Sequence, residues 1–434
     1  MTLQAILPRL LSPFSSVKKM FVLAVFLVLL HVLFIYKFTL LLGGSQFILV
    51  KIYIILTGFF LTSRFLIIIF YKDAHYKKYA DTLYPSVSFV IAAKNEEDSI
   101  YKTIETCMQS AYPGTLECIA VDDGSTDKTK AEMERAHEFY KNKGVSVNVI
   151  SFAKNRGKRE GMAEGILAAT GEIVVFVDSD SFLEKTAVKH LVEHFLEDSM
   201  VGAVAGNTGV DNDSTNALTK MQSARYGVSF DIFKACESVF GTVTCCPGCF
   251  SAYRRTILLT VLDKWRNQMF MGTRSTFGDD RSLTNFVLRN WKVVYCSTAK
   301  AVTIVPDKYR KFFKQQLRWK KSWVREGLAA SSFIWRKNII ASLSFYTNLL
   351  LPIFSPFIVL NALVIQILLN QQMPYVFLIG VVSLSFVYGL FYYWQSNNKY
   401  WWYVVPFTVM YTFALVWQMP YAVFKLRDTT WGTR

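Results

Sequence analysis

The sequence predicts an α/β domain with a parallel sheet, inserted between hydrophobic helices that cross or line a membrane. Three observations lead to this prediction. Apolar residues gather toward the two ends of the 434-residue chain, while the middle is polar. The middle alternates short β-branched runs with helical stretches. Charged loops follow three of the predicted strands, at the sheet edge where such folds bind ligands.

The N-terminal 80 residues are predicted to form a membrane hairpin. Met20–Tyr36 carries no formal charge, and Phe47–Tyr71 is apolar except for Lys51 and Arg64. Each is near the ~20 residues that a transmembrane helix needs. The first segment lacks a small-residue cleavage site, so we expect an anchor and not a removable signal peptide. Basic residues flank both ends of the hairpin, which predicts that both ends, and the polar middle, are cytoplasmic.

The amino-acid composition and net charge indicate which classes of molecule the protein could bind. The chain is 52% hydrophobic and has a net charge of +16, which suits anionic lipid headgroups and an anionic substrate. No nucleic-acid-binding motif is present, so no nucleic-acid partner is expected. Seven cysteines in a cytosolic setting predict no disulfides. Cys245, Cys246 and Cys249 have metal-like spacing, but no fourth zinc ligand lies near them in the sequence.

The polar middle begins with a regular alternation of elements. Helices are expected from Lys94 through about Gln109 and over Lys128–Tyr140. The expected strands are Ser86–Ala93, Leu116–Val121, Val145–Phe152 and Ile173–Val177. The last of these is a continuous apolar run, which is typical of a strand buried on both faces.

Three polar loops follow these strands. The first contains Asp122 and Asp123, and the second, Asn155–Glu160, contains Lys158 and Arg159. The third is Asp178-Ser179-Asp180, whose two carboxylates can hold one hard cation such as Mg²⁺ or Mn²⁺. Together they predict a nucleotide-diphosphate site without a phosphate-binding lysine loop or a Gly-x-Gly-x-x-Gly pattern.

Two further motifs carry possible chemistry. His190-x-x-Glu193-His194 matches an inverted zinc-peptidase pattern, although no third ligand is evident in the sequence. Asp279 and Asp280 precede a predicted helix, Ser282–Arg289, and one of them could accept a proton from an attacking hydroxyl. The alternative role for this acidic pair is compensation of the helix dipole.

The C-terminal third is apolar again. Tyr309–Leu328 predicts a basic, aromatic helix at the membrane surface. Ile339–Leu369 could cross the membrane, with Pro352 and Pro356 kinking or dividing it, and Tyr375–Trp394 crosses back. Tyr400–Leu426 is expected to re-enter or to lie at the interface.

At this point the motifs resemble those of the processive, membrane-bound family 2 glycosyltransferases, and among these the class I hyaluronan synthases. Four ordered motifs over about 200 residues carry the resemblance: Asp-Asp-Gly, Asp-x-Asp, an acidic pair and Gln-Gln-x-Arg-Trp. The terminal Trp431-Gly432-Thr433-Arg434 also matches. The resemblance implies a GT-A-type (Rossmann-like) cytosolic catalytic domain inserted between transmembrane and interfacial helices.

The resemblance also implies roles for individual residues. Asp123, beside Asp122, would contact the uracil, and Lys158 and Arg159 would lie near the diphosphate. Asp180, with Asp178, would bind Mn²⁺ or Mg²⁺, and Asp280, next to Asp279, would be the general base. Arg318 would neutralise the leaving diphosphate, and Trp319 would stack on the acceptor sugar. Gln315 and Gln316 of the same motif would bind substrate. Trp431 and Arg434 would belong to a gating segment.

The implied activity is synthesis of hyaluronan from UDP-N-acetylglucosamine and UDP-glucuronic acid, with export of the growing polysaccharide by a monomer in the plasma membrane. Cys246–Arg255 departs from many hyaluronan synthases and looks more like chitin-type and nodulation-type synthases, so chitin or chitooligosaccharide synthesis from UDP-N-acetylglucosamine alone is the alternative. A transporter or receptor that only binds a nucleotide sugar is a second alternative, in which Asp280 would have no task. The chain stops directly after Arg434, and truncation of a longer parent stays open.

The resemblance divides the chain into five parts. The expected boundaries are 1–80 for the membrane hairpin, 81–308 for the catalytic domain, 309–336 for the interfacial helices, 337–426 for the C-terminal membrane and re-entrant helices, and 427–434 for the gating segment.

Overall fold

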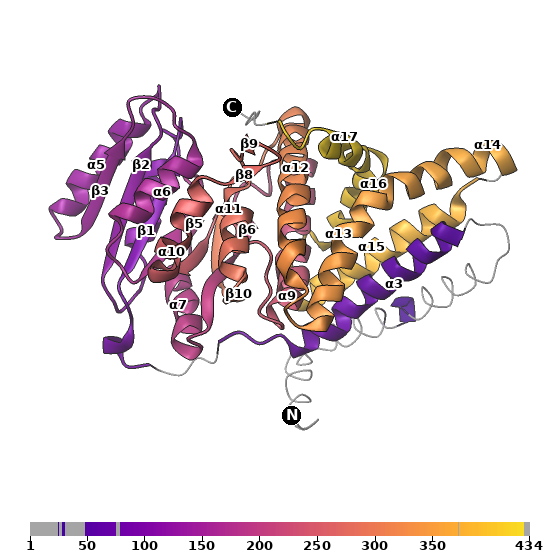
Figure 1. Cartoon of the computed structure of the whole chain (residues 1–434), viewed down its shortest axis with the longest axis horizontal. Coiled ribbons are helices and arrows are strands. Elements are labelled where there is room, and N and C mark those ends of the chain that lie inside the picture. The colour runs from indigo at the N-terminus through magenta and orange to yellow at the C-terminus, as the bar shows by residue number, and fades with distance from the viewer. Residues whose placement is uncertain (1–24, 26–27, 31–47, 75–78, 372, 429–434) are drawn as a thin grey trace.

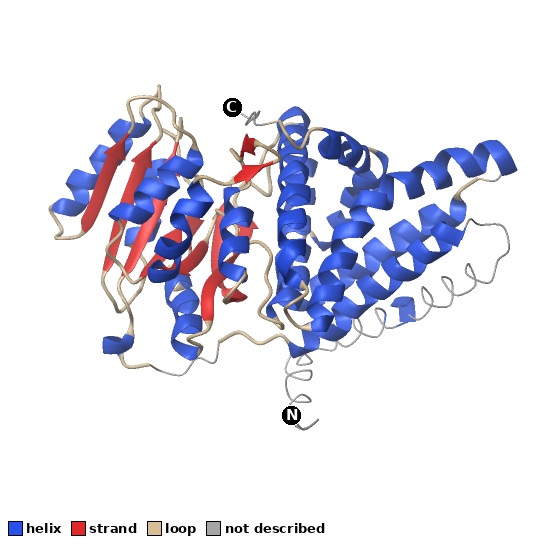
Figure 2. Ribbon diagram, in the orientation of Figure 1, coloured by secondary structure: helices blue, strands red, loops and turns tan. Residues whose placement is uncertain are grey.

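The computed structural model describes residue 25 and residues 28–30, 48–74, 79–371 and 373–428. An α/β domain and a group of long helices lie side by side, with helix α12 (Tyr309–Ile334) between them (Figure 1). Figure 2 shows that all the strands belong to the α/β part. The predicted fold class is therefore confirmed. The first predicted span, Met20–Tyr36, and the Trp431–Arg434 segment lie largely or wholly outside the described residues.

One eight-stranded sheet forms the α/β domain, in the order β3-β2-β1-β4-β7-β6-β10-β5. A separate pair, β8 (Met269–Phe270) and β9 (Thr273–Arg274), lies outside it. The strands of the large sheet are β1 (Val87–Ala93), β2 (Leu116–Asp122), β3 (Ser146–Ser151), β4 (Ile173–Phe176), β5 (Ser181–Leu183), β6 (Val201–Val210), β7 (Ser251–Arg254) and β10 (Lys292–Thr303).

The sheet is mixed, which corrects the expectation of a parallel one. Strands β1 to β4 pair in parallel, as do β6 and β10, but β7 runs antiparallel between β4 and β6. Phe176 at the end of β4 pairs with Ser251 at the start of β7. The loop before β7 therefore reaches the sheet at the edge where β4 ends, because the two strands run in opposite directions.

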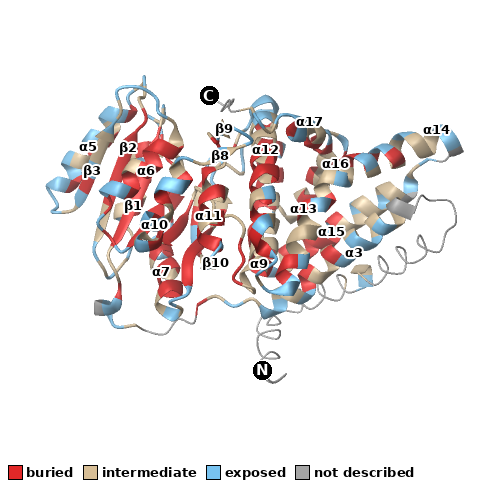
Figure 3. Cartoon of the chain, in the orientation of Figure 1, coloured by how far each residue is buried: buried red, intermediate tan, exposed pale blue. Residues whose placement is uncertain are grey.

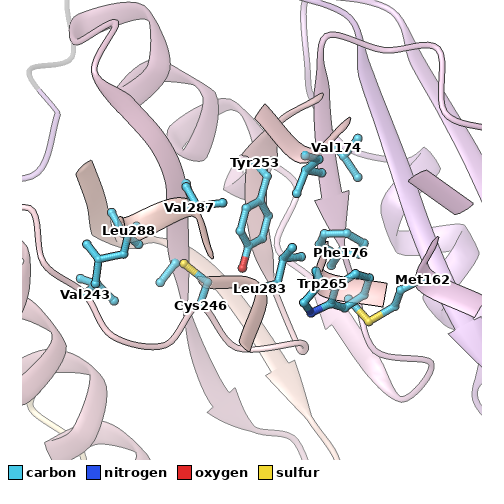
Figure 4. Packing of buried hydrophobic residues seen from close by; sticks show 14 of the residues in the cluster. Met162, Val174, Phe176, Val243, Cys246, Tyr253, Trp265, Leu283, Val287 and Leu288 are labelled. Carbon is cyan, nitrogen blue, oxygen red and sulfur yellow. The ribbon is translucent and has the colours of Figure 1, made fainter. Parts of the chain in front are cut away.

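Helices cover both faces of the sheet and bury two apolar cores (Figure 3). One core holds the fully buried Trp265 and Tyr253, packed with Met162, Phe176 and Leu283 (Figure 4). The helices of this domain are α4 (Ile100–Met108), α5 (Thr129–Lys141), α6 (Lys158–Ala168), α7 (Ala187–Glu197), α8 (Ala217–Gly227), the π-helix Val228–Lys234, α9 (Ala235–Ser238), α10 (Arg255–Arg266) and α11 (Asp279–Leu288), preceded by the 3₁₀ turn Asp81–Leu83.

Two predicted helix boundaries near the sheet edge were wrong. Helix α4 begins at Ile100 and not at Lys94. Asn95 adopts a left-handed conformation (φ 55°), and its side-chain oxygen accepts a hydrogen bond from the Thr126 backbone N–H at 2.9 Å. The segment after β1 is thereby joined to the loop after β2. In addition, helix α11 begins at Asp279 and not at Ser282, so the acidic pair belongs to its first turn.

Three helical segments are long and apolar enough to cross a membrane, or four if one bent pair is a single span; this holds for the described residues. The spans are Val50–Phe70, Ile339–Leu369 and Phe377–Ser396, and the bent pair, at 45°, is Trp401–Phe413 with Leu415–Phe424. They comprise α3 (Ile48–Ile67), the 3₁₀ turn Ile68–Phe70, α13 (Ile339–Leu360), the π-helix Asn361–Ile365, α14 (Gln366–Asn370), α15 (Tyr375–Ser396), the 3₁₀ turn Trp401–Tyr403, α16 (Val404–Phe413), the 3₁₀ turn Leu415–Trp417 and α17 (Gln418–Phe424).

Pro352 and Pro356 do not divide the second span. Both lie inside α13, which continues to Leu360 and passes into a π-helix at Asn361. Long apolar side chains on these helices face outward, and Phe59 is 76% exposed. Exposed apolar surface of this extent is unfavourable in water and is expected where lipid covers it.

Candidate active site

Three loops meet at the edge where β1, β2 and β4 end. Asp123, at the end of β2, accepts hydrogen bonds from the backbone N–H groups of Arg156 (2.6 Å) and Gly157 (3.0 Å). Lys158, the first residue of α6, forms an ion pair with Asp178, which follows β4. The acidic loop, the basic loop and the Asp-x-Asp loop therefore form one site, as expected from parallel strands with a common edge.

Asp123 is buried, and burial raises the pKa of its carboxyl even though the Arg156 and Gly157 N–H groups lower it. Gly157 occupies a backbone conformation with φ 95°, which L side chains rarely adopt. This turn points two successive N–H groups at one carboxylate. Asp122 is also buried, and its carboxylate accepts from the Ser125 N–H at 3.0 Å. Asp122 thus shapes the loop that presents Asp123.

Lys158 and Asp178 form the charged centre of the site. Burial favours the neutral forms of both groups, but their mutual attraction outweighs it, so the pKa of Lys158 rises and that of Asp178 falls. The Cys249 thiol also hydrogen-bonds to Asp178. Asp280 adds to the negative field at Lys158, and Arg318 adds to the positive field at Asp178. Residues from three other segments therefore act on this one pair.

Asp180 lies beyond Asp178, where the chain crosses from β4 to β5. Its carboxylate accepts from the Thr303 hydroxyl of β10 at 3.2 Å, and its backbone carbonyl accepts from the Ile304 N–H. Both carboxylates act electrostatically on the Cys249 thiol, whose pKa is raised by burial and by their charge. Two partly exposed carboxylates in one short loop, facing a common neighbour, are a donor set that fits a hard divalent cation.

The acidic pair at the start of α11 separates into two environments. Asp279 is buried and accepts from the Arg159 Nε at 2.6 Å, and the Arg159 Nη1 donates to the Trp265 carbonyl. Asp280 is partly exposed, and the Cys245 thiol contacts its Oδ2 at 3.7 Å. Asp279 and Arg159 thus form an ion pair in the protein interior, while Asp280 faces the site.

A left-handed glycine makes this separation possible. Gly278 has φ 75° and packs so closely against α12 that an added Cβ would lie 2.0 Å from the Ser322 Oγ. The Arg325 guanidinium of α12 donates to the Phe277 carbonyl. The start of α11 is therefore fixed against the helix that carries Gln315, Gln316, Arg318 and Trp319.

The α12 motif supplies the remaining wall of the site. Gln316 is buried, and the Gln315 Oε1 has no hydrogen-bond partner among the described residues. The Trp319 ring lies 6.4 Å from the Tyr226 ring, and the Arg225 guanidinium lies 5.7 Å above it. Farther along α12, Lys321 forms an ion pair with Asp428 at 3.1 Å. The end of the described chain is thus held beside α12; Trp431 and Arg434 lie outside the described residues.

The cysteine loop before β7 belongs to the site, where its residues contact the two carboxylates and helix α11. Cys245 contacts Asp280, Cys249 contacts Asp178, and the Cys246 N–H donates to the Thr284 hydroxyl. Within the described residues, no group of three potential metal ligands includes these thiols. The sequence did not predict that Cys249 contacts Asp178 or that Gly248 packs close to it. The one feature that could have indicated this is the Cys-Pro-Gly-Cys turn directly before a strand.

The inverted peptidase pattern also fails as a zinc site. The His190 Nδ1 contacts the Thr298 carbonyl at 3.0 Å, and the Glu193 Oε1 accepts from the Tyr84 hydroxyl at 2.9 Å. His190 and Glu193 therefore have structural partners. His194 instead lies 3.4 Å from Asp73, which is distant in the sequence.

A side chain at position 248 should disturb the site sterically. A Cβ at this position would lie 2.9 Å from the Asp178 Oδ1 and 3.2 Å from the Lys158 Nζ. Gly248→Ala should displace this ion pair and lower transfer activity about tenfold to hundredfold, because misplacement on the ångström scale is costly in catalysis. UDP release measures the effect. Gly209→Ala, where a Cβ meets only ordinary contacts of 3.4 Å or more, should retain activity; equal activity of both variants would contradict the prediction.

Comparison with known proteins places this geometry in a family. Residues 88–262 match the model of glycosyl transferase family 2. A hyaluronan synthase from Streptococcus pyogenes is 30% identical over 358 residues, covering 80% of this chain and 83% of that protein. The chain belongs to the hyaluronan synthase family. It is accordingly a family 2 glycosyltransferase of the processive type.

Other similar proteins broaden the comparison. An N-acetylglucosaminyltransferase from Mesorhizobium japonicum is 33% identical over 265 residues, covering 60% of this chain and 61% of that protein. A mannosyltransferase from Pyrobaculum calidifontis, solved with GDP-Man and Mn²⁺, superposes with a TM-score of 0.60 at 19% identity, covering 89% of this chain and all of that one. This likeness confirms the predicted GT-A-type fold.

Proposed function

We propose that this glycosyltransferase polymerises N-acetylglucosamine and glucuronic acid from their UDP-sugars into hyaluronan and exports the polymer through its own membrane helices. The observation that carries the proposal is the junction of the Lys158–Asp178 pair, Asp180, Asp280 and the Arg318–Trp319 motif in one site beside apolar helices. The similarity to a hyaluronan synthase over four fifths of the chain supports the choice of substrates.

The residues divide the reaction between them. Asp280 accepts the proton from the acceptor hydroxyl, whose oxygen forms a bond to the anomeric carbon of the donor sugar. The bond from that carbon to the diphosphate breaks on the opposite face, and UDP leaves with the electron pair. Lys158 and Arg318 stabilise the negative charge that develops on the diphosphate. Asp123 orients the uracil, and Trp319 stacks on the acceptor sugar.

Asp178 and Asp180 would hold Mn²⁺ or Mg²⁺, which supplies further charge neutralisation at the diphosphate when bound. Lys158 holds the Asp178 carboxylate in its charged form. Both metals accept carboxylate and phosphate oxygens, so the donor set is compatible with either.

We place the catalytic domain (81–308) in the cytoplasm and the protein in the plasma membrane, as a monomer. The interfacial helix region 309–336 would lie along the membrane, and 337–426 would contain spanning and re-entrant helices. The bend of 45° between Trp401–Phe413 and Leu415–Phe424 supports a re-entrant segment. The ion pair of Asp428 with Lys321 supports a gating role for 427–434, since it holds this end of the chain beside α12.

A partly open pocket beside the membrane helices supports export of the polymer. It lies between α3, α9, the end of α12 and α13, and Thr244 in its wall precedes Cys245, which contacts Asp280. One loop therefore connects the wall of the pocket with the proposed base, and membrane helices form another part of that wall.

Substitutions at Ser344 and Leu343 of α13 test whether the polymer passes through this pocket. Ser344 lines the pocket, whereas Leu343 is 63% exposed. Ser344→Trp should obstruct the pocket and shorten the polymer several-fold, because an indole adds bulk where the chain would pass. Leu343→Trp should leave polymer length unchanged. Gel analysis of the product measures length, and normal polymer from Ser344→Trp would place the path elsewhere.

The substrates are tested with purified, detergent-solubilised protein and Mn²⁺ or Mg²⁺. UDP release is measured with UDP-N-acetylglucosamine, UDP-glucuronic acid, or both. Sustained turnover only with both donors, giving a hyaluronidase-sensitive polymer, is the expected result. Equal turnover with UDP-N-acetylglucosamine alone and a chitinase-sensitive product would instead establish chitin-type synthesis, which the likeness to N-acetylglucosaminyltransferases keeps as the second candidate.

A further inference from the structure

A buried group of potential metal ligands lies well apart from the proposed active site, where the linker after α3 meets the catalytic domain. Its members are Asp73 of the linker, His194 in the last turn of α7 and Cys296 of β10. One potential ligand atom from each lies within 4.8 Å of the others. Three segments distant in the sequence thus present an oxygen, a nitrogen and a sulfur to one point. Figure 1 shows the linker leaving the lower end of α3 toward α7.

The histidine is the observation that indicates a ligand. His194 is 7% exposed, and its Nε2 has a single long contact, 3.4 Å from the Asp73 Oδ1, within the described residues. One long contact satisfies a buried nitrogen poorly, and a cation bound between the imidazole and the carboxylate would be a ligand for both. His190, one turn earlier, differs because its Nδ1 contacts the Thr298 carbonyl.

The carboxylate is oriented in the way that metal ligands usually are. Asp73 accepts hydrogen bonds from the Tyr71 hydroxyl at 2.8 Å and from the Ser297 backbone N–H at 3.1 Å, and the Ser297 hydroxyl also donates to it. Such outer partners fix a ligand and tune its affinity for the metal. They come from both sides of the junction, Tyr71 from the linker and Ser297 from β10.

Donor type and charge together select the metal. A thiolate, an imidazole and a carboxylate suit Zn²⁺, whose bonds of about 2.0–2.3 Å place tetrahedral ligand atoms about 3.3–3.8 Å apart. This spacing falls within the observed limit of 4.8 Å. The Cys296 thiol donates to the His190 carbonyl at 3.6 Å, so binding of Zn²⁺ would release this proton to solvent and replace that contact. Zn²⁺ with one carboxylate and the resulting thiolate has no net charge, which removes the cost of burying either anion alone.

We propose that Asp73, His194 and Cys296 bind one Zn²⁺, with water as the fourth ligand. The ion fastens the linker that follows membrane helix α3 to helix α7 and strand β10 of the catalytic domain. This structural metal is separate from the Mn²⁺ or Mg²⁺ of the active site, and its presence does not depend on which sugars the enzyme transfers.

Cobalt tests the site, because Co²⁺ replaces Zn²⁺ in such sites and a thiolate–cobalt bond gives a charge-transfer absorption that oxygen ligands do not give. The full-length protein in detergent is stripped with a chelator and titrated with Co²⁺ alone. We expect one Co²⁺ with this absorption per chain. Cys296→Ser and His194→Gln should lose the absorption, and Ser297→Ala should weaken Co²⁺ binding about tenfold to hundredfold.

The controls separate this site from the active site. Cys249→Ser removes the thiol next to Asp178 and should keep the absorption, as should His190→Gln on the same helix as His194. Ser297→Ala removes one hydroxyl, so its effect does not depend on a variant that fails to fold. Absence of the absorption in the unmodified protein, or its persistence in Cys296→Ser, would overturn the proposal and leave an ion pair between His194 and Asp73. Loss of the absorption in Cys249→Ser would place the thiolate site at the active centre and equally overturn it.

Discussion

Replacing Asp280 with asparagine should abolish sugar transfer while UDP binding remains. The amide cannot accept the proton of the acceptor hydroxyl, and loss of a positioned general base typically costs about 10²- to 10⁴-fold in rate. Asp280 faces Lys158 and Cys245 and lies outside the buried Arg159 pair. Its replacement should therefore leave the fold intact. UDP release measures turnover, and titration with UDP measures binding.

The neighbouring carboxylate provides the matched control. Asp279→Asn leaves the Arg159 guanidinium, 5% exposed, without its charged partner. Removal of one member of a buried ion pair typically costs about 3–5 kcal/mol of folding free energy. We expect Asp279→Asn to lower the thermal unfolding temperature and Asp280→Asn to leave it nearly unchanged. Wild-type turnover in Asp280→Asn would remove the assignment of the base, and unchanged stability in Asp279→Asn would contradict a structural role for that residue.

Asp180→Asn should eliminate the dependence of UDP binding on Mn²⁺ or Mg²⁺. A neutral amide is a weaker ligand for a hard cation than a carboxylate, and the lost charge also leaves the diphosphate less well neutralised. We expect UDP affinity in the presence of metal to fall about hundredfold, to the level of the metal-free protein. Calorimetric titration of UDP at several Mn²⁺ concentrations measures this effect.

Thr303→Val is the graded control for Asp180. It removes the hydroxyl that donates to the Asp180 Oδ1 at 3.2 Å but keeps the carboxylate. Metal-dependent binding should persist in this variant with an affinity for metal about tenfold weaker, since partners of a ligand usually have smaller effects than the ligand itself. Undiminished metal dependence in Asp180→Asn would show that Asp180 is not a metal ligand.

Local pattern was enough to predict most elements of the sheet. Strands β1, β2, β3 and β4 lie within one or two residues of the predicted runs, because β-branched and aromatic residues bounded by polar turns favour strands. The apolar spans Val50–Phe70, Ile339–Leu369 and Phe377–Ser396 were equally predictable, since a membrane requires about 20 apolar residues in a helix. Helix α4 was predicted too early because Asn95 takes a left-handed conformation that helical periodicity does not reveal.

The antiparallel direction of strand β7 was not predictable from the local pattern of apolar and polar residues. Strand β7 is four residues long and pairs on both sides with strands far away in the sequence. Its direction depends on how the chain returns from the π-helix Val228–Lys234 and α9, and no local propensity encodes this. As a result, the contacts of Gly248 and Cys249 with Asp178 emerge only when β7 is placed antiparallel beside β4.

The sequence by itself determined the fold class, the three polar loops at one sheet edge and the chemical types of the site residues. These follow from local periodicity and from the common edge of parallel strands. Only the tertiary structure decided which of two adjacent aspartates faces the site, because Gly278 and helix α12 direct Asp279 to Arg159 and leave Asp280 exposed. It likewise turned His194 away from the His190 pattern toward Asp73 and Cys296. In both cases the partner is over 100 residues away in the sequence, and packing of the whole chain brings the two side chains together.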